Sequence, residues 1–390
     1  INCTKTINTS VRSIITTNSD DHIGLSVVRS LGRNNVEFQV VSNTKNTLAW
    51  HSRYTNNKII SRYDLDFFLK LSKDDVVFPL LEKTMLLLAK NKLKLQCQLG
   101  FSDYETLLRT GDKSLLIQHA IEHNIPCPKT FFITKSEDIQ ACISALDFPI
   151  ILKPRNEAGG KGIQLVDSPE LLPAIAEKFL ADYSCFLLQE KIPYTTKYTI
   201  GTLCNSEHDL RRVCVIKELR NYPVESGQSC YVETVNEPGL VKFAEKLLKS
   251  LNFVGVADID LVIDTRDKQP KLMEINPRFW GSLQVAINAG VDFPNLLYTM
   301  LKDGDIDKSL SYKTGIRCRY MLYNDLMSLI TLMQSNYPAE NKRETLKDFF
   351  IIPKDEGYYV YSYDDIMPFF ELTYIKLLRI FGLDRKDQTK

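Results

Sequence analysis

Residues 150–162 read IILKPRNEAGGKG, and they predict a glycine-rich turn between two β-strands, residues 148–153 and 162–167. Glycines allow consecutive backbone N–H groups to turn toward an anion without interference from a Cβ atom, and lysines add positive charge. The loop is not a Walker A motif, because a glycine and a strand follow its lysine instead of Ser or Thr and a helix. A plain flexible hairpin is the alternative. The predicted phosphate-binding residues are Lys153, Gly159, Gly160, Lys161 and Gly162.

Residues 254–276 place acidic and amide side chains at alternate positions of two neighbouring strands. Asp258 and Asp260 share one face of the first strand, and Glu274 and Asn276 share one face of the second. If Asp260 lies opposite Glu274 in an antiparallel hairpin, Asp258 lies opposite Asn276, and Val262 opposite Leu272. Opposed carboxylates repel unless a cation lies between them, and an all-oxygen set suits Mg²⁺, with Mn²⁺ as a substitute. We therefore predict a metal site at Asp260, Glu274 and Asn276, with a solvated acidic hairpin as the alternative.

Residues 274–282, EINPRFWGS, resemble the signature of the carboxylate–amine ligase group of the ATP-grasp superfamily. The resemblance extends from Ser13 to beyond Pro294. It implies an α/β fold with α+β grasp lobes and ATP between the two lobes. The implied parts are a Rossmann-like N-terminal domain (1–108), a small central lobe (109–192), a C-terminal lobe with the metal and substrate site (193–325) and a helical extension (326–390).

The resemblance also implies roles for individual residues. Lys113 and Lys153 would reach the α- and β-phosphates. The backbone of the hinge between the lobes would bind the adenine edge, at Gln189, Glu190, Lys191 and Ile192. Many members of the family carry a ribose-binding Glu shortly after this hinge, where residues 194–197 read YTTK.

A basic and aromatic segment, residues 211–223, follows as RRVCVIKELRNYP. Strand alternation would place Lys217 on one face and Glu218 and Arg220 on the other. In this ligase group the matching strand faces the γ-phosphate and the acceptor. We therefore expect Lys217 or Arg220, together with Arg278, to neutralise the phosphoryl group during transfer. A solvated basic strand is an equally strong alternative for the first two arginines.

These features predict an ATP-dependent ligase. Transfer of the γ-phosphoryl group to a carboxylate would give an acyl phosphate, which an amine attacks to form an amide, with ADP and phosphate as products. Such a transfer depends on positioning and charge neutralisation, so no covalent nucleophile is needed. The expected substrates are a small-molecule carboxylate and an amine, such as an amino acid or peptide-like acceptor. The alternatives are a nucleotide-sensing ATP-grasp protein without turnover and a carboxylating or phosphorylating relative.

Composition narrows the class of protein. The chain has 390 residues, 44% of them apolar and 25% charged, which suffices for two or three domains. Its net charge of +1 leaves no electrostatic footprint for nucleic acid. No apolar run is long enough for a membrane span, and the first residues lack a signal-peptide core. Nine cysteines without a C-x-x-C pair indicate free thiols in a reducing compartment, so we expect a cytoplasmic protein.

Three further segments carry weaker predictions. Residues 11–41 predict a βαβ opening without G-x-G-x-x-G, which gives no support for a dinucleotide site. His119 and His123 stand one helical turn apart, but H-E-x-x-H is absent, so surface or partly buried histidines are expected rather than zinc ligands. Residues 366–381 predict an amphipathic helix, more typical of a core or dimer contact than of a membrane anchor, and a homodimer is a candidate.

Overall fold

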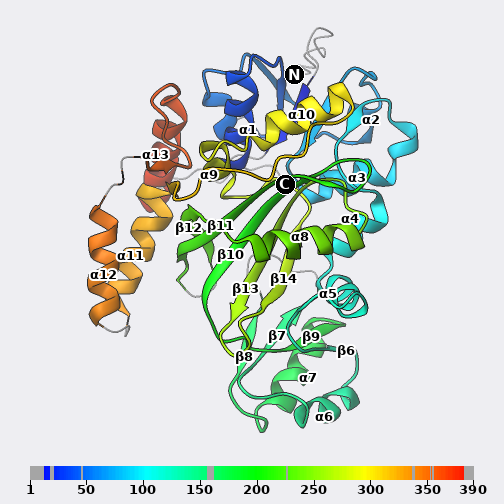
Figure 1. Ribbon diagram of the computed structural model, residues 1–390, viewed down its shortest axis with the longest axis vertical. Helices are drawn as coiled ribbons and strands as arrows, with labels where there is room; N and C mark the ends of the chain where they lie inside the picture. Colours follow the sequence, from blue (N-terminus) through cyan, green and yellow to red (C-terminus); the bar gives the residue numbers. More distant parts are fainter. Residues whose placement is uncertain are drawn as a thin grey trace.

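The computed structural model describes residues 13–17, 22–44, 47–155, 162–224, 227–335, 339–351, 353 and 355–381. At the N-terminal end, five parallel strands form a sheet in the order β3-β2-β1-β4-β5 (Figure 1). The strands are β1 (Ser13–Thr17), β2 (Gln39–Ser42), β3 (Asn57–Ile60), β4 (Val76–Pro79) and β5 (Gln98–Leu99). The helices are α1 (His22–Arg33), η1 (Leu48–His51), α2 (Leu65–Phe68), α3 (Glu82–Lys90) and η2 (Lys92–Lys94).

This sheet is buried on both faces. Ile14 belongs to one core cluster and its neighbour Ile15 to another, because successive side chains of a strand point in opposite directions. Such double burial is typical of parallel sheets. The predicted βαβ opening is confirmed, since β1 and β2 pair in parallel across α1, while residues 11 and 12 of the predicted first strand lie outside the described part.

A second, antiparallel sheet has the order β6-β9-β7-β8. Its strands are β6 (Thr130–Ile133), β7 (Ile150–Pro154), β8 (Gln164–Val166) and β9 (Phe186–Glu190). Helices α6 (Glu137–Ile143) and α7 (Leu172–Asp182) share a core with this sheet, and α4 (Tyr104–Gly111) and α5 (Lys113–Glu122) precede it in the chain. Pairing of β7 with β8 confirms the hairpin predicted around the glycine-rich turn. In Figure 1 this small lobe lies at the end of the molecule opposite α1.

The third sheet has seven strands in the order β14-β13-β10-β11-β12-β15-β16. They are β10 (Tyr194–Cys204), β11 (Leu210–Tyr222), β12 (Gln228–Thr234), β13 (Gly255–Asp264), β14 (Pro270–Asn276), β15 (Arg317–Arg319) and β16 (Gly357–Tyr358). Helix α8 (Pro238–Ser250) packs on one face, against β10 and β11. Helices α9 (Leu283–Asn288) and α10 (Phe293–Asp303) pack between the other face and the N-terminal sheet, in a core that both share.

The C-terminal segment contains η3 (Met321–Asp325), α11 (Leu326–Gln334), α12 (Ala339–Phe350) and α13 (Met367–Ile380). It also supplies β16, so the large sheet crosses the boundary proposed at residue 325. Helix α13 packs on η1, and a fully buried ion pair of 2.9 Å joins Arg29 of α1 to Asp365. The segment thus returns to the N-terminal sheet (Figure 1). Across the described ranges, no helix has the length and apolar character that a membrane crossing requires.

Candidate active site

The β13–β14 hairpin brings four oxygen-bearing side chains together. Asp260 lies directly opposite Glu274, and Asp258 lies opposite Asn276. The Asn276 Nδ2 atom donates to Glu274 Oε1 at 3.3 Å and to Asp258 Oδ2 at 3.4 Å. The predicted register of these two pairs is therefore the one observed.

The next pair of the hairpin was predicted incorrectly. A register shift beyond Asp260 pairs Leu261 with Leu272 and Val262 with Lys271, so Val262 does not face Leu272. A β-bulge of this kind adds one unpaired residue to one strand and bends the ladder locally. The carboxylate pairs thus lie immediately beside a distortion that strand alternation could not predict.

The environment of these carboxylates favours a bound cation. Burial, followed by the charges of Glu274 and Glu218, raises the pKa of Asp258 to about 8 against the opposing charge of Arg278. Burial, followed by the charge of Asp258, raises the pKa of Asp260 well above its usual range. In addition, the Oδ1 atom of Asp258 is buried without a hydrogen-bond partner. A positive ion would lower both pKa values and would give the Asp258 Oδ1 atom a partner, so the donor set fits Mg²⁺.

The cluster is open rather than a closed metal cage. In the described part of the chain, no three His, Cys, Asp or Glu side chains converge closely enough to enclose an ion alone. Mg²⁺ usually keeps several waters and is bound by one or two carboxylates together with substrate phosphate oxygens. An open pair formed by Asp260 and Glu274 suits that mode of binding.

Glu218 is a fourth carboxylate on this face, and the sequence analysis did not assign it to the site. Thr199 Oγ1 donates to Asp260 Oδ1 at 2.8 Å and lies 3.5 Å from Glu218 Oε1. The Nδ2 atom of Asn221 donates to the other oxygen of Glu218 at 2.6 Å. Burial raises the pKa of Glu218. Only the pairing of three strands reveals this neighbour, since Glu218 is distant in sequence from Asp260.

The two predicted phosphate lysines approach the hairpin from the small lobe. Lys113 Nζ lies 3.8 Å from Glu274 Oε2, and Lys153 Nζ donates to Gln189 Oε1 at 2.7 Å. Burial lowers the pKa of Lys153 to about 8; the Glu274 charge raises it, and the charges of Lys113 and Lys197 lower it. The structure therefore brings Lys113, Lys153 and Glu274 together. It also adds Lys197, which the sequence analysis noted only as a departure from the ribose-binding pattern.

The start of α5 fixes the position of Lys113. Asp112 caps this helix by accepting hydrogen bonds from the backbone N–H groups of Ser114 (2.9 Å) and Leu115 (3.2 Å). The same carboxylate accepts a hydrogen bond from Arg155, the residue after β7. One capping residue thus ties the Lys113 helix to the strand that leads into the glycine-rich turn.

Of the predicted turn residues, only Gly162 can be placed. Gly159, Gly160 and Lys161 lie outside the described residues. Gly162 has a φ of +70°, and a Cβ atom there would lie 2.6 Å from Pro154 Cγ. Both its backbone conformation and the space around it therefore require glycine.

The predicted hinge lies at the end of β9. Gln189 is buried, and its Nε2 atom donates to Thr130 Oγ1 at 2.9 Å, which orients the oxygen that binds Lys153. The Glu190 carboxylate accepts from the Lys129 backbone N–H at 2.7 Å and from Arg266 at 2.8 Å. Lys191 and Ile192 follow the last ladder residue of β9 and precede β10. The predicted hinge residues thus lie between the small antiparallel sheet and the seven-stranded sheet.

Lys217 lies on the other face of the sheet from the carboxylates. Lys217 pairs with Glu233, whereas Glu218 pairs with Val232, and cross-strand partners share a face. Because consecutive residues of a strand point to opposite faces, Lys217 points away from Glu218 and its neighbours. The structure therefore does not bring Lys217 to the carboxylates.

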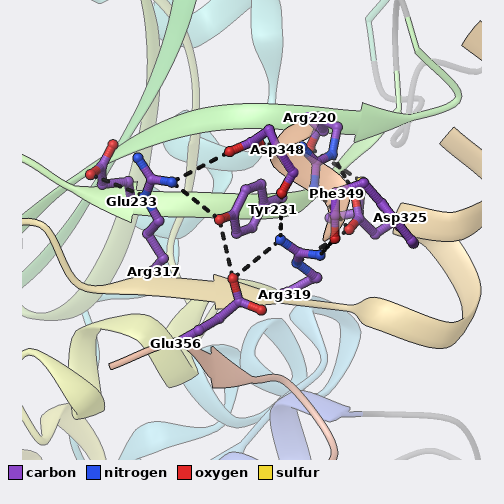
Figure 2. A network of polar contacts seen from close by, with 10 residues as sticks. Arg220, Tyr231, Glu233, Arg317, Arg319, Asp325, Asp348, Phe349 and Glu356 are labelled. Atoms are coloured by element: carbon purple, nitrogen blue, oxygen red, sulfur yellow. Dashed lines mark hydrogen bonds and ion pairs between the residues drawn. The ribbon is translucent and has the colours of Figure 1, made fainter. Parts of the chain in front are cut away.

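Arg220 also lies away from the carboxylates, and the prediction that it shares a face with Glu218 is wrong. A β-bulge between them pairs Arg220 with Tyr231, next to the partner of Glu218. Figure 2 shows Arg220 held by two carboxylates, with Nε 2.6 Å from Asp325 Oδ1 and Nη1 2.6 Å from Asp348 Oδ2. Its guanidinium lies 4.3 Å from the centre of the Tyr231 ring. These contacts are those of a structural arginine.

The network around Tyr231 joins the C-terminal segment to the large sheet. Arg319 lies 4.3 Å from the same ring centre and pairs with Glu356 at 3.2 Å and Asp325 at 3.4 Å (Figure 2). Arg317 pairs with Glu233 at 3.3 Å. The two acids that Arg319 contacts belong to η3 and the loop before β16, so the network anchors η3 and the start of β16 to β11, β12 and β15.

Arg278 remains beside the carboxylates. Its positive charge lowers the pKa of Asp258, opposing the effect of burial, and its Nη1 atom donates to the Phe279 carbonyl oxygen at 2.9 Å. Arg278 also lines a small hollow with Phe78 and Pro79 at the end of β4. Of the three predicted catalytic residues, it is the one that the structure brings to the site.

The histidine pair of α5 has structural partners. His119 Nε2 lies 3.0 Å from Ser250 Oγ, and His123 Nδ1 lies 2.9 Å from the His119 carbonyl oxygen. The two rings stack with centres 3.9 Å apart. Burial lowers the pKa of His119 to about 4. The preference for partly buried histidines over zinc ligands agrees with these contacts.

Comparisons with known proteins support the fold. Residues 110–282 match the family model described as an ATP-grasp domain. An ADP complex of N5-carboxyaminoimidazole ribonucleotide synthetase has a TM-score of 0.65 at 14% identity, covering 87% of this chain and 96% of that chain. The chain therefore has the ATP-grasp fold, as the resemblance at residues 274–282 implied, and its residues 110–282 match an ATP-grasp domain.

Two curated relatives match at similar identity. The arginine-specific large chain of carbamoyl phosphate synthase from Geobacillus stearothermophilus is 25% identical over 181 residues, which is 44% of this chain and 17% of that protein. D-alanine–D-alanine ligase from Methylococcus capsulatus is 25% identical over 190 residues, 46% of this chain and 61% of that protein. The chain spans about a fifth of the length of the carbamoyl phosphate synthase large chains that it matches.

Proposed function

We propose that this protein is an ATP-dependent ligase that activates a carboxylate as an acyl phosphate and joins it to an amine. The observation that carries the proposal is the contact between Lys113 Nζ and Glu274 Oε2 at 3.8 Å. It brings the half-buried lysine pair of the small lobe to the carboxylate hairpin of the large sheet. Phosphates that bind the lysines would then lie beside a metal that binds the hairpin.

Each group has a defined part in the proposed reaction. Lys113 and Lys153 bind the α- and β-phosphates, and the backbone at Lys191 and Ile192 binds the adenine edge. Asp260, Glu274 and Asn276 hold Mg²⁺, which neutralises charge on the phosphate oxygens. Arg278 lies on the side of the hairpin that faces the N-terminal sheet, where it is placed to bind the carboxylate or the transferring phosphoryl group.

The proposed chemistry balances in two steps. A carboxylate oxygen attacks the γ-phosphorus, and the bond from that phosphorus to the ADP oxygen breaks. An amine nitrogen then attacks the acyl carbon, the bond from that carbon to the phosphate oxygen breaks, and the nitrogen loses one proton. The products are an amide, ADP and phosphate.

The relatives support this reaction class in different ways. A D-alanine–D-alanine ligase, by its name, uses an amino acid as acceptor, which favours an amine acceptor here. The similarity to carbamoyl phosphate synthase keeps a carboxylating or phosphorylating relative as the second candidate. Both candidates share the ATP site and differ in what attacks the activated group.

The test supplies the protein with ATP, Mg²⁺, pools of amino acids and hydroxylamine. Hydroxylamine traps acyl phosphates as hydroxamates, so the proposal requires ADP, phosphate and a coloured hydroxamate. Lys153→Met should abolish all three products. Lys217→Met is the matched control, because this lysine lies on the other face of the sheet, and it should retain them. ADP without hydroxamate favours the second candidate, and nucleotide binding without ADP from any acceptor pool contradicts both.

A further inference from the structure

Helix α13 exposes a regular row of large apolar side chains. The row consists of Met367 (58% exposed), Phe370 (53%), Tyr374 (59%), Leu377 (47%) and, just after the helix, Phe381 (70%). Its spacing of three and four residues is that of the a and d positions of a heptad repeat, which line one seam of a helix. Leu372, at the opposite position of the heptad, is fully buried. The helix therefore has one apolar face for its own core and a second one in solvent.

The seam carries almost no charge. The positions beside it include Ile366, Thr373 and Leu378, and the acid among them, Glu371, lies 3.7 Å from His51 Nε2 on the surface of the same molecule. The whole chain has a net charge of only +1, so two copies would not repel each other at long range. A seam of this kind accepts an identical helix without opposing like charges.

The exposed area is sufficient for a specific dimer. Tyr363, four residues before the first residue of α13, is 91% exposed and extends the row beyond the N-terminal end of the helix. With large side chains of about 200 Å² each, the five residues of the row and Tyr363 expose about 760 Å² per copy. Two copies would bury on the order of 1,500 Å², which lies within the range of specific interfaces. A few scattered apolar residues would not reach that size.

We propose that the α13 seam is a self-association surface that binds the α13 seam of a second copy of this chain, antiparallel and about a two-fold axis. Antiparallel pairing sets a positions against d positions, so Met367 meets Leu377 and Phe370 meets Tyr374 of the other copy. At each end of the seam, Phe381 of one copy then contacts the exposed Tyr363 of the other copy. Antiparallel helix dipoles also attract each other, and a two-fold interface buries the same patch on both copies.

The experiment measures the mass of the full-length chain by sedimentation equilibrium at micromolar concentration. The proposal requires a dimer of twice 44.7 kDa. Tyr374→Glu, in the centre of the seam, should raise the dissociation constant at least tenfold and leave the melting temperature of the monomer unchanged. Leu93→Glu is the matched control, because Leu93 is fully exposed in η2, and it should leave the dimer intact. A monomeric wild type, or a dimer unaffected by Tyr374→Glu, overturns the proposal.

Two further measurements address orientation and the other occupant. A mixture of Met367→Cys and Leu377→Cys proteins should form a disulfide between the two variants, beyond the background of the wild type. Cross-links only between identical variants would overturn the antiparallel arrangement. Co-sedimentation of a monomeric wild type with anionic lipid vesicles, lost in Tyr374→Glu, would assign the seam to a membrane surface and overturn the proposal of a second copy.

Discussion

Replacement of Glu274 by Gln should make the protein slightly more stable without Mg²⁺ and inactive with it. Glu274 lies directly opposite Asp260 and raises the pKa of both Asp258 and Asp260 by its charge, in addition to the effect of burial. Glutamine has the same shape but no charge, so it removes this repulsion and also removes a metal ligand. The loss of repulsion should raise the stability measured without Mg²⁺, and the loss of the ligand should lower the activity measured with Mg²⁺.

The magnitude follows from the geometry of the pair. When both are ionised, two carboxylates about 5 Å apart repel by about 3 kcal/mol at an effective dielectric constant of about 20. The Glu274 side chain is 38% exposed, so solvent screening reduces the value to about 1–2 kcal/mol. The lost contact with Lys113, at 3.8 Å and partly exposed, is worth less than about 1 kcal/mol. The unfolding free energy should therefore rise by about 1 kcal/mol, and the melting temperature by about 2 °C.

The gain in unfolding free energy of Glu274→Gln over the wild type should depend on pH. The pKa of Asp258 is about 8 in the folded protein, whereas an aspartate in an unfolded chain has a pKa of about 3.9, so the folded state binds this proton more tightly. The resulting stability is complete below the unfolded pKa and is lost as the pH rises toward 8. Repulsion by Glu274 acts only on ionised carboxylates. The difference between variant and wild type should accordingly grow from about pH 5 to about pH 8.

The assays are thermal unfolding with EDTA or with Mg²⁺, and ADP release with ATP and the acceptor pools. With Mg²⁺ the wild type should gain stability by mass action and the variant should gain less, while ADP release should fall at least about 100-fold. Glu245→Gln, on the surface of α8, is the matched control and should change neither property. Wild-type ADP release by Glu274→Gln, or equal stabilisation of both proteins by Mg²⁺, would refute the metal assignment.

Three further changes test other parts of the site. The pKa of Lys153 is about 8, so this lysine loses its charge as the pH rises above that value. The nucleotide affinity of the wild type, measured by calorimetry, should therefore weaken up to tenfold per pH unit above about pH 8. Lys153→Met should bind the nucleotide weakly at every pH. Asp325→Asn should lower the unfolding free energy by about 3 kcal/mol in denaturant titrations, because it removes the buried carboxylate that both Arg220 and Arg319 contact and leaves Arg220 with Asp348 alone. ADP release per folded molecule should stay unchanged. Gly162→Ala should raise the nucleotide dissociation constant several-fold, because φ is +70° and a Cβ atom would collide with Pro154; wild-type affinity in this variant would contradict the role of the turn.

The sequence was most informative where a regular pattern continues without interruption. With Asp260 opposite Glu274, strand alternation correctly placed Asp258 opposite Asn276, because no bulge separates the two pairs. Likewise, the glycine-rich segment was correctly placed between two strands, since Gly162 requires a conformation that other residues rarely adopt. Both predictions depend on local geometry, which the sequence specifies directly.

Predictions failed where a strand departs from its regular period or where distant strands meet. The pairing of Val262 changed because of the register shift next to Asp260, and no residue type in the segment signals that shift. Glu218 joined the carboxylates because β10 lies between β11 and β13, an order that follows from the fold of the whole sheet. Lys197 was interpreted only as a departure from the ribose-binding pattern of the family. Its position two residues before Thr199 places it on the face of the sheet that carries Asp260.

The bulge in β11 places Glu218 and Arg220 on opposite faces of the sheet. Glu218 and Arg220 are two residues apart, so an undistorted strand would point both toward the carboxylates. A permanently charged guanidinium there would neutralise the groups proposed to hold a cation. The extra residue turns Arg220 to the opposite face, where Asp325 and Asp348 hold it and Glu218 remains with Asp260. The distortion thus keeps the metal side acidic and, through the same strand, fixes the C-terminal segment on which α13 depends for its position.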